Sequence, residues 1–407
     1  MGVAITLAFL YLIMCRKLRF QRINEMHKKF SYALEGRSGL KQMTLEDAWE
    51  IHKTVMELEF PFMYDLSYKM SFLRTYPIRS ISKLLVHTGN LYCPTKVAKR
   101  YVDTTVLMNE FMLFPPNSER ANSGISRMNY MHNVYRKSRL LTDDDMLYVL
   151  ALFAVDPCYW VNRLEWRKLT DLERCAMGLF WHSIGMHMDI PFDKLRSGYT
   201  KSWRDGLQFF EELQQFADEY ELVNYDPHDE GKELADRIME MVLRDVPTFL
   251  WGLSGQVLNA VLEKRLRDGL MYPDPSRVYQ WIVDTTWSTR RFILRHLTPP
   301  RPDSRPYRIL SSGKNSNGRY SRLVYEAEPW YTPATFGQRW GFKAFFKSVL
   351  RQPIPGDNVK YFPDGYDHMD IGPSNKQGKG EKEFAEGLQN IKLNPQPRCP
   401  FFAKGDV

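Results

Sequence analysis

Apolar residues recur at spacings of three and four along most of the chain up to about residue 300, and strand-like alternation is scarce. This periodicity is typical of amphipathic helices. The clearest case is 119–137, where Ile125, Met128, Met131 and Tyr135 fall on one face. We therefore predict an all-α fold made of many helices.

Capping signals place several helix starts. Thr44 and Thr170 each stand three residues before an acidic residue, which is the spacing of a capping box, and Thr142 can cap a helix whose first turn holds three aspartates. Pro157 is expected to end the helix that starts after Thr142, because proline removes a helical hydrogen bond. The predicted helices are 45–59, 64–75, 78–88, 97–111, 119–137, 143–156, 171–187, 201–221, 231–269 (kinked or divided at Pro247) and 277–297.

His132 lies on the apolar face of the helix at 119–137, one turn beyond Met128. Two explanations fit an inward-facing histidine among methionines and aromatics. It is either a core histidine with hydrogen-bonded ring nitrogens, or an axial ligand of a buried metal or haem.

Two polar residues interrupt the apolar stripe of the preceding helix. Val97, Arg100, Thr104, Leu107 and Phe111 share that stripe. A buried arginine needs a partner, because an unpaired buried charge is costly. Arg100 is therefore either part of a structural ion pair or the wall of a pocket, where it meets an anionic or oxygen-bearing ligand.

The first residues read as a short membrane anchor. The run at 2–15 carries no charge, and as a helix it spans ~21 Å against ~30 Å of hydrocarbon. Basic residues follow it in the segment Cys15–Arg22, which predicts that the bulk of the protein stays on the cytosolic face. A cleaved signal peptide would need the basic residues before the run. A myristoylation pattern and a buried N-terminal helix are the other interpretations.

Composition shifts after about residue 302. The segment 299–306 is rich in proline, and the remainder is loop-rich and mostly polar. We expect an anchor with its basic flank at 1–20, a helical catalytic domain at 21–302, and an irregular C-terminal arm at 303–407 that packs on the body. The polar tail from Ser374 is expected to be mobile.

Composition narrows the class of protein. Apolar residues make up 43% of the 407 residues and the net charge is +8, without any nucleic-acid-binding motif. The five cysteines show no paired spacing, which agrees with a reducing compartment. Dinucleotide, P-loop, hydrolase-elbow, zinc-protease and EF-hand motifs are absent from the sequence. What remains is a helical protein with a buried histidine and a buried arginine.

The order of several segments resembles the fungal ER-bound oxygenases of the mpaB type, which share a catalytic domain with the bacterial rubber oxygenases (latex clearing proteins). The segments are EFPFMY (59–64), TYPIRSISKLLVHTG (75–89), KRYVDT (99–104), the arginine-to-histidine stretch 127–132, LALFAVDP (150–157), EWRKLTDLERCAMGLFW (165–181), RFILRHLTPPRP (291–302), and GQRWG, IPGD, YFPDGY and DIGP in the tail.

The resemblance implies an all-α fold around haem b, with dioxygen as co-substrate and oxidative cleavage of a double bond in an isoprenoid chain. In the fungal branch this chain is the prenyl side chain of a meroterpenoid intermediate. His132 occupies the place of the haem-iron ligand. Arg100 and Thr104 match an Arg-x-x-Lys-Thr segment of the distal pocket, and Arg127 and Arg136 are expected to meet the haem propionates.

The chain departs from the family pattern at several positions. Asp103 stands in place of the distal lysine, Asn129 in place of an arginine, and Val149 in place of a threonine. No counterpart of the rubber oxygenases' catalytic glutamate is evident, so the base or oxygen-activating group has no assignment.

The sequence thus predicts a haem-dependent oxygenase anchored in the endoplasmic reticulum membrane by a single pass. It would act on a small hydrophobic prenylated substrate, without nucleic acid and without an obligate protein partner. Two alternatives stay open: a non-catalytic membrane-associated protein that binds a hydrophobic ligand, and a haem-free isomerase or cyclase that uses Arg100 and His132 as acid and base.

Overall fold

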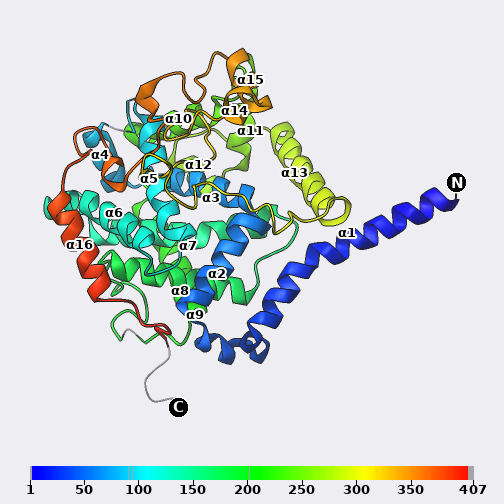
Figure 1. Cartoon of the computed structure of the whole chain (residues 1–407), viewed down its shortest axis with the longest axis horizontal. Helices are drawn as coiled ribbons and strands as arrows, with labels where there is room; N and C mark the ends of the chain where they lie inside the picture. Colours follow the sequence, from blue (N-terminus) through cyan, green and yellow to red (C-terminus); the bar gives the residue numbers. More distant parts are fainter. Residues whose placement is uncertain (1, 90, 94, 201, 402–407) are drawn as a thin grey trace.

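A computed structural model describes residues 2–89, 91–93, 95–200 and 202–401. Within them the chain is all-helical, and β-structure is limited to three isolated bridges. The all-α prediction is confirmed. The helices, in chain order (Figure 1), are α1 (Gly2–Lys29), α2 (Leu45–Thr54), α3 (Pro61–Thr75), α4 (Arg79–Thr88), α5 (Val97–Leu113), α6 (Glu119–Lys137), α7 (Asp143–Leu164), α8 (Asp171–His187), α9 (Gly206–Asn224), α10 (Asp229–Leu243), α11 (Trp251–Val261), α12 (Lys264–Gly269), α13 (Arg277–Phe292), α14 (Phe336–Trp340), α15 (Phe342–Val349) and α16 (Glu381–Leu393).

Local capping sets many of these boundaries. Thr44, Thr142 and Thr170 each accept a hydrogen bond from a backbone N–H three residues later, and the acidic residue there completes the box. Gly89 ends α4 in the left-handed conformation at φ 66°, which glycine adopts without a steric penalty. These predicted starts and this stop are confirmed.

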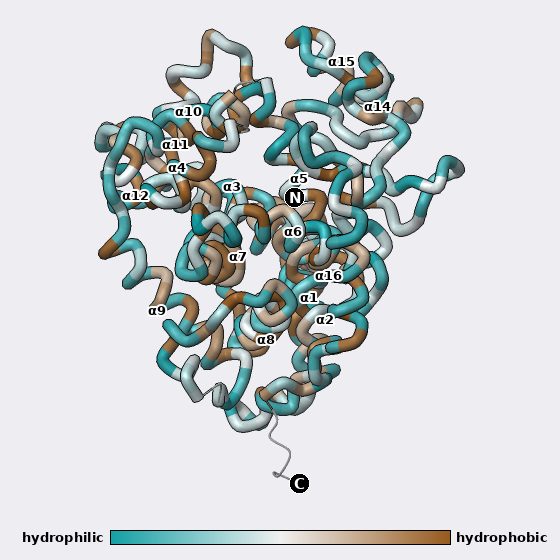
Figure 2. The backbone as a smooth tube through the Cα atoms, turned by 90° about the vertical axis from the view of Figure 1, so that its left-hand side faces the viewer, coloured by the Kyte–Doolittle hydropathy of each residue, from teal (hydrophilic) through white to brown (hydrophobic). Residues whose placement is uncertain are grey.

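The core is built around α7, which packs between α3 on one side and α8 and α9 on others. In Figure 2, hydrophobic (brown) segments of the chain lie around α7 in the interior. Gly178 of α8 permits one close contact, because a Cβ there would lie 1.8 Å from the carbonyl oxygen of Gly206 in α9.

Pro157 does not end α7, contrary to the prediction. The helix continues to Leu164, with Pro157 inside it. An interior proline costs about 3 kcal/mol. Trp160, Val161 and Leu164 beyond it are all buried, and each contributes about 1.5–3 kcal/mol through burial. Packing therefore outweighs the local penalty.

The stretch 231–269 divides further than predicted. It forms α10, a short 3₁₀ turn η3 (Thr248–Leu250), α11 and α12. Pro247 precedes η3 as its cap, so the break lies at the proline as expected, and a further break separates α11 from α12.

The C-terminal segment lies across the helical body. Leu310, Tyr331, Tyr366 and Ile371 belong to the hydrophobic core. The polar tail contains a helix that was not predicted, α16, which packs on α6. Residues 402–407, the end of the expected mobile tail, lie outside the described residues.

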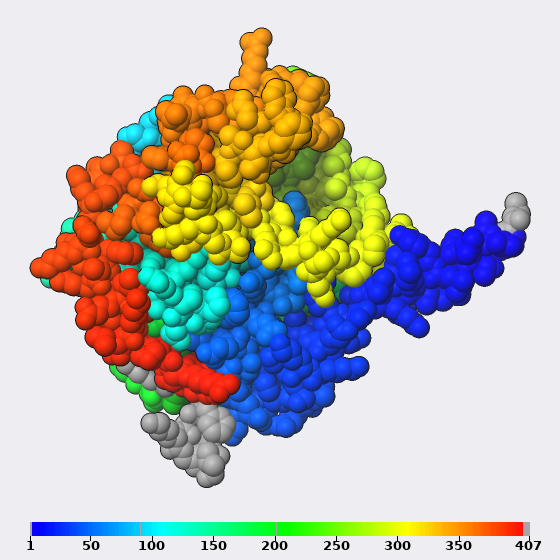
Figure 3. Space-filling model, viewed as in Figure 1, coloured from blue at the N-terminus to red at the C-terminus, as the bar shows by residue number. Residues whose placement is uncertain are grey.

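At the N-terminus, α1 projects from the body (Figures 1 and 3). Val3, Ile5, Leu7 and Phe9 are exposed along it. Among the described residues, no helix combines the length and the apolar character that crossing a membrane requires.

Candidate functional site

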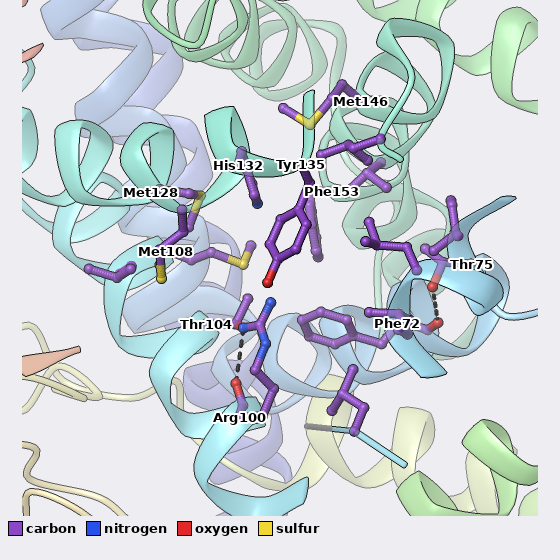
Figure 4. Close-up of a pocket in the computed structure, with 18 of the residues that line it drawn as sticks. Phe72, Thr75, Arg100, Thr104, Met108, Met128, His132, Tyr135, Met146 and Phe153 are labelled. Carbon is purple, nitrogen blue, oxygen red and sulfur yellow. Dashed lines mark hydrogen bonds between the residues drawn. The ribbon is translucent and has the colours of Figure 1, made fainter. Parts of the chain in front are cut away.

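A cavity with a volume of about 190 Å³ lies between α3, α4, α5, α6 and α7. Trp181 of α8, Ile238 of α10 and Pro373 of the C-terminal arm complete its walls. The lining is mainly aromatic, methionine and aliphatic side chains, as Figure 4 shows for Phe72, Phe153, Met108 and others. Among the described residues, no carboxylate lines the cavity, and the charged side chains in its wall are Arg100 and Lys376.

α6 carries His132 into this cavity, as the periodicity predicts. Ser118 caps the helix by accepting a hydrogen bond from the N–H of Ala121 at 3.2 Å. Gly124 then lets α6 approach α5 closely, because a Cβ at this position would lie 2.8 Å from Cβ of Glu110. This close packing sets His132 opposite the face of α5 that bears Arg100.

The imidazole of His132 is neutral, and its Nδ1 lacks a partner. Burial, together with the charges of Arg100 and Arg136, lowers the pKa of His132 to about 4. Its Nδ1 is buried and accepts or donates no hydrogen bond within the described residues. At Nδ1, His132 thus lacks the hydrogen bond that a satisfied core histidine would make.

Arg100 and Thr104 face the cavity one turn apart on α5 (Figure 4). Arg100 donates a hydrogen bond to Oγ1 of Thr104, and Thr104 donates one to the carbonyl of Arg100 at 3.0 Å. Burial lowers the pKa of the Arg100 guanidinium, which nevertheless stays protonated at neutral pH. Arg100 thus presents a fixed positive charge inside an apolar chamber.

Tyr135 is a site residue that the sequence indicated only as part of an apolar stripe. It lies one turn after His132, and Figure 4 shows its hydroxyl pointing toward Arg100. Its helical position could have identified it, since it shares the face of His132. His132, Arg100, Thr104 and Tyr135 are the polar groups that converge here.

Arg127 does not line the cavity. It is fully buried on another face of α6 and binds carbonyl oxygens of the C-terminal arm. The acceptors are Ile371 at 3.0 Å, Lys379 at 2.8 Å, and Met369 and Lys376 at 2.9 Å each. Its observed role is to hold the arm against α6.

Arg136 also points away from the cavity lining. It donates to the carbonyls of Met188 at 3.2 Å and Asp189 at 3.0 Å, and pairs with Asp143 at 2.7 Å. Lys376, carried by the arm that Arg127 fixes, lines the cavity instead. Nothing in its local sequence indicated this position.

The three departures from the family pattern have different surroundings. Asp103 is buried away from the cavity, paired with Lys99 at 2.7 Å and bonded by the hydroxyl of Tyr331 at 2.8 Å. Asn129 donates to the carbonyl of His187 at 2.8 Å. Val149 lines the cavity.

The donor set fits a cofactor that needs a single axial ligand. In the described part of the chain, no three His, Cys, Asp or Glu side chains group closely enough to hold a metal ion. A haem iron needs one side chain on its proximal side. His132, neutral in an apolar chamber and without a hydrogen bond at Nδ1, fits that requirement, and Lys376 is a cation available to a propionate.

The chain is similar to fungal oxygenases along most of its length. The ER-bound oxygenase mpaB' of Penicillium brevicompactum is 37% identical over 392 residues, 96% of this chain and 92% of the relative. The ER-bound oxygenase mpaB of the same fungus is 34% identical over 384 residues, 94% and 89% of the two chains. An ER-bound oxygenase mpaB of Penicillium roqueforti is 37% identical over 269 residues, 66% of this chain and 89% of the relative. No protein-family model matches the chain.

Proposed function

The chain belongs to the mpaB family of ER-bound oxygenases, and from this premise we propose that it is a haem-dependent oxygenase that cleaves a carbon–carbon double bond in the prenyl side chain of a small hydrophobic substrate, using dioxygen. The fungal meroterpenoids are the substrate class to which the family resemblance points. The observation that carries the proposal is the neutral imidazole of His132, without a hydrogen bond at Nδ1, inside an apolar cavity opposite Arg100.

His132 would hold the cofactor by ligating its iron. Haem b, when bound, would supply the redox-active iron that activates dioxygen. The low pKa of His132 keeps a lone pair free for ligation at neutral pH. Lys376 is the group that would meet a propionate, in place of Arg127 and Arg136.

The other residues of the cavity would bind and orient the substrate. Phe72, Phe153 and Met108 provide an apolar wall for an isoprenoid chain and exclude water from it. Arg100, steadied by Thr104, places positive charge where negative charge develops on oxygen during the reaction. The hydroxyl of Tyr135 is a hydrogen-bond donor on the same side.

Membrane attachment suits such a substrate, because a prenyl chain partitions into lipid. We assign this attachment to the apolar, exposed first half of α1, as a single-pass anchor in the endoplasmic reticulum membrane. The basic residues that follow would keep the catalytic body on the cytosolic face.

Isotope labelling tests the reaction. Cleavage of one double bond by one dioxygen produces two carbonyl groups, each with one oxygen atom from dioxygen. Purified protein, supplied with haem, a prenylated aromatic compound and ¹⁸O₂, is expected to form two carbonyl products that each carry one labelled atom. A single labelled oxygen on an uncleaved chain would contradict double-bond cleavage, and unchanged substrate without oxygen uptake would favour a non-catalytic binding protein.

Arg100→Met tests the residue assigned to charge stabilisation. We expect kcat to fall roughly 100- to 1000-fold, the typical cost of losing a preorganised charge-stabilising group. The haem content of the variant should stay near that of the wild type, because His132 is intact. Arg100→Lys, which keeps the charge, should lose less activity than Arg100→Met.

A further inference from the structure

Helix α15 exposes its apolar side chains to water and buries a charged one. Phe342 and Phe345 are 80% and 65% exposed, and Phe346 and Val349 are exposed as well. The inner side of the same helix carries Lys347, which is 2% exposed. A soluble surface normally exposes lysine and buries phenylalanine.

Both lysines of α15 have specific partners in the body of the protein, although only Lys347 is buried. Lys347 pairs with Asp245 and donates to the side chain of Gln352 at 2.9 Å. Lys343 donates to the carbonyl of Tyr325 and lies over its ring. These contacts fix the orientation of α15, and its phenylalanines therefore face outward.

Helix α14 repeats this arrangement. Phe336 and Trp340 are exposed, whereas Gln338 donates inward to the carbonyl of Leu323 at 2.7 Å. Arg339 also turns inward, to the carbonyl of Pro355 and to Asp357. Two consecutive short helices therefore direct polar side chains toward the protein and aromatic rings outward.

Exposed apolar side chains continue from α15 to α1 through packed elements. α15 contacts the turn after α10 through Asp245, and Phe249 is exposed just beyond that turn. α11 follows and packs on α13, where Val278 and Trp281 are exposed. α13 continues into η4 (Ile293–Leu297), which packs on α1, and the hydroxyl of Tyr11 donates to the carbonyl of Leu297 at 3.0 Å.

Figure 1 shows α15, α14, α11, α13 and the projecting part of α1 in succession along one edge of the molecule. In Figure 3 the same order appears from orange through yellow-green to blue. We define the aromatic face as Phe249, Trp281, Phe336, Trp340, Phe342 and Phe345.

We propose that the aromatic face docks on the surface of a lipid bilayer, as a second membrane contact beside the apolar half of α1. Phenylalanine and tryptophan on such a face insert into the interfacial region, and neighbouring basic groups attract anionic headgroups. Arg277 and Arg295 are exposed at the two ends of the α13–η4 stretch, and Arg351 is exposed directly after α15. Continuity with α1 and this charge pattern favour a bilayer as the occupant.

Tryptophan quenching tests the docking in the full-length protein. The protein is reconstituted into vesicles of phosphatidylcholine and phosphatidylinositol, with brominated acyl chains as quencher. Trp281 and Trp340 should be quenched by the brominated lipid and protected from iodide in the water. The lipid-quenched component should fall roughly twofold or more in the double variant Trp281→Phe/Trp340→Phe, because interfacial rings reach the acyl boundary.

Trp49→Phe is the matched control. Trp49 is part-buried on α2, donates to the carbonyl of Met112 at 3.1 Å and is absent from the aromatic face, so its loss should not change the lipid-quenched component. In a second comparison, Phe342→Ser/Phe345→Ser should lower the lipid-quenched component roughly twofold or more. Leu222→Ser/Val223→Ser, which removes exposed apolar groups on α9, should not.

Three outcomes would overturn the docking. Trp281 and Trp340 could remain open to iodide on vesicle-bound protein, which would place the face in water. Trp281 and Trp340 could be inaccessible both to iodide and to brominated lipid, which would place a second copy of the chain on the face. The protein could fail to bind the vesicles. None of these readouts depends on haem or turnover, so they are independent of the proposed oxygenase reaction.

Discussion

Buried histidines outside the cavity make the folded state sensitive to acid. His52 stacks on Phe180 with both ring nitrogens unpartnered, and burial lowers the pKa of His52 to about 3. His182 lies among Phe192, Trp203 and Phe209, and burial lowers its pKa to about 3 as well. Both rings are neutral in the folded protein near neutral pH.

The sign of the pH effect follows from proton uptake. Below an unfolded pKa near 6.5 the unfolded chain binds a proton at His52 that the folded chain does not bind, so stability falls as the pH falls. From pH 6.5 to 4 this costs about 3 kcal/mol for one such group. His52→Leu should flatten the decline of the unfolding free energy over this range, measured by denaturant titration. His87→Leu, at an exposed position, serves as the control, and an equal slope in wild type and His52→Leu would contradict the account.

Mutation can distinguish the roles of Arg127 and Arg136. Arg127→Met leaves four carbonyl acceptors of the arm without their donor. We therefore expect the free energy of unfolding to fall by about 3 kcal/mol or more. Backbone amides of residues 369–379 should also exchange their hydrogens faster. Arg136→Met should leave the exchange of the arm unchanged. Loss of haem from Arg127→Met with full protection of the arm would support the propionate role that the sequence suggested.

Sequence spacing identified part of the candidate site. The inward direction of His132, Arg100 and Thr104 follows from helical periodicity, which is local information. The partners of Arg127 lie more than 240 residues further along the chain, so no local pattern could show them. Lys376 enters the cavity wall only because those partners hold its segment in place.

At the scale of elements, the spacing of α5 and α6 sets the geometry of the cavity. Gly124→Ala would place a Cβ 2.8 Å from Cβ of Glu110 and 3.2 Å from the carbonyl of Leu107. We expect it to force the helices apart and to cost about 1–3 kcal/mol of stability. His132 should also shift relative to Arg100, which would appear as weakened haem retention.

Gly255→Ala on α11 is the matched control, because a Cβ there meets no atom within 4 Å. It should stabilise the protein by about 0.4–1 kcal/mol. Thermal unfolding of the two variants checks the pair. Equal effects of the two substitutions would show that the α5–α6 contact is not a tight one.

Helix boundaries were predictable where a cap specifies them and not where packing overrides local preference. Thr142 and Thr170 mark starts that the structure contains. The predicted helix end at Pro157 was wrong, because burial of the residues beyond it stabilises a continuous helix. α16 was missed because its sequence is mostly polar, and only Ile391 in it is buried.

In the whole molecule, the C-terminal arm closes a cavity whose walls come mainly from the helical body, and the arm itself contributes Pro373 and Lys376. Tyr331 bonds Asp103 behind α5, and Arg127 secures the arm on α6. α1 and the aromatic face lie along one edge (Figure 1), so the proposed membrane contact would lie on helices packed on the body that encloses the cavity. The all-α class followed from periodicity, whereas the course of residues 303–393 depends on long-range contacts.

A visible absorption spectrum, with haem extracted as its pyridine complex, tests whether His132 ligates a haem in this cavity. His132→Gln is compared with His182→Gln, which removes another buried histidine with an unpartnered Nδ1 that does not line the cavity. We expect a Soret band near one haem per chain in the wild type and in His182→Gln, and its loss or shift in His132→Gln with the fold retained. A colourless wild-type protein after expression with ample haem, or an unchanged spectrum in His132→Gln, would contradict the account.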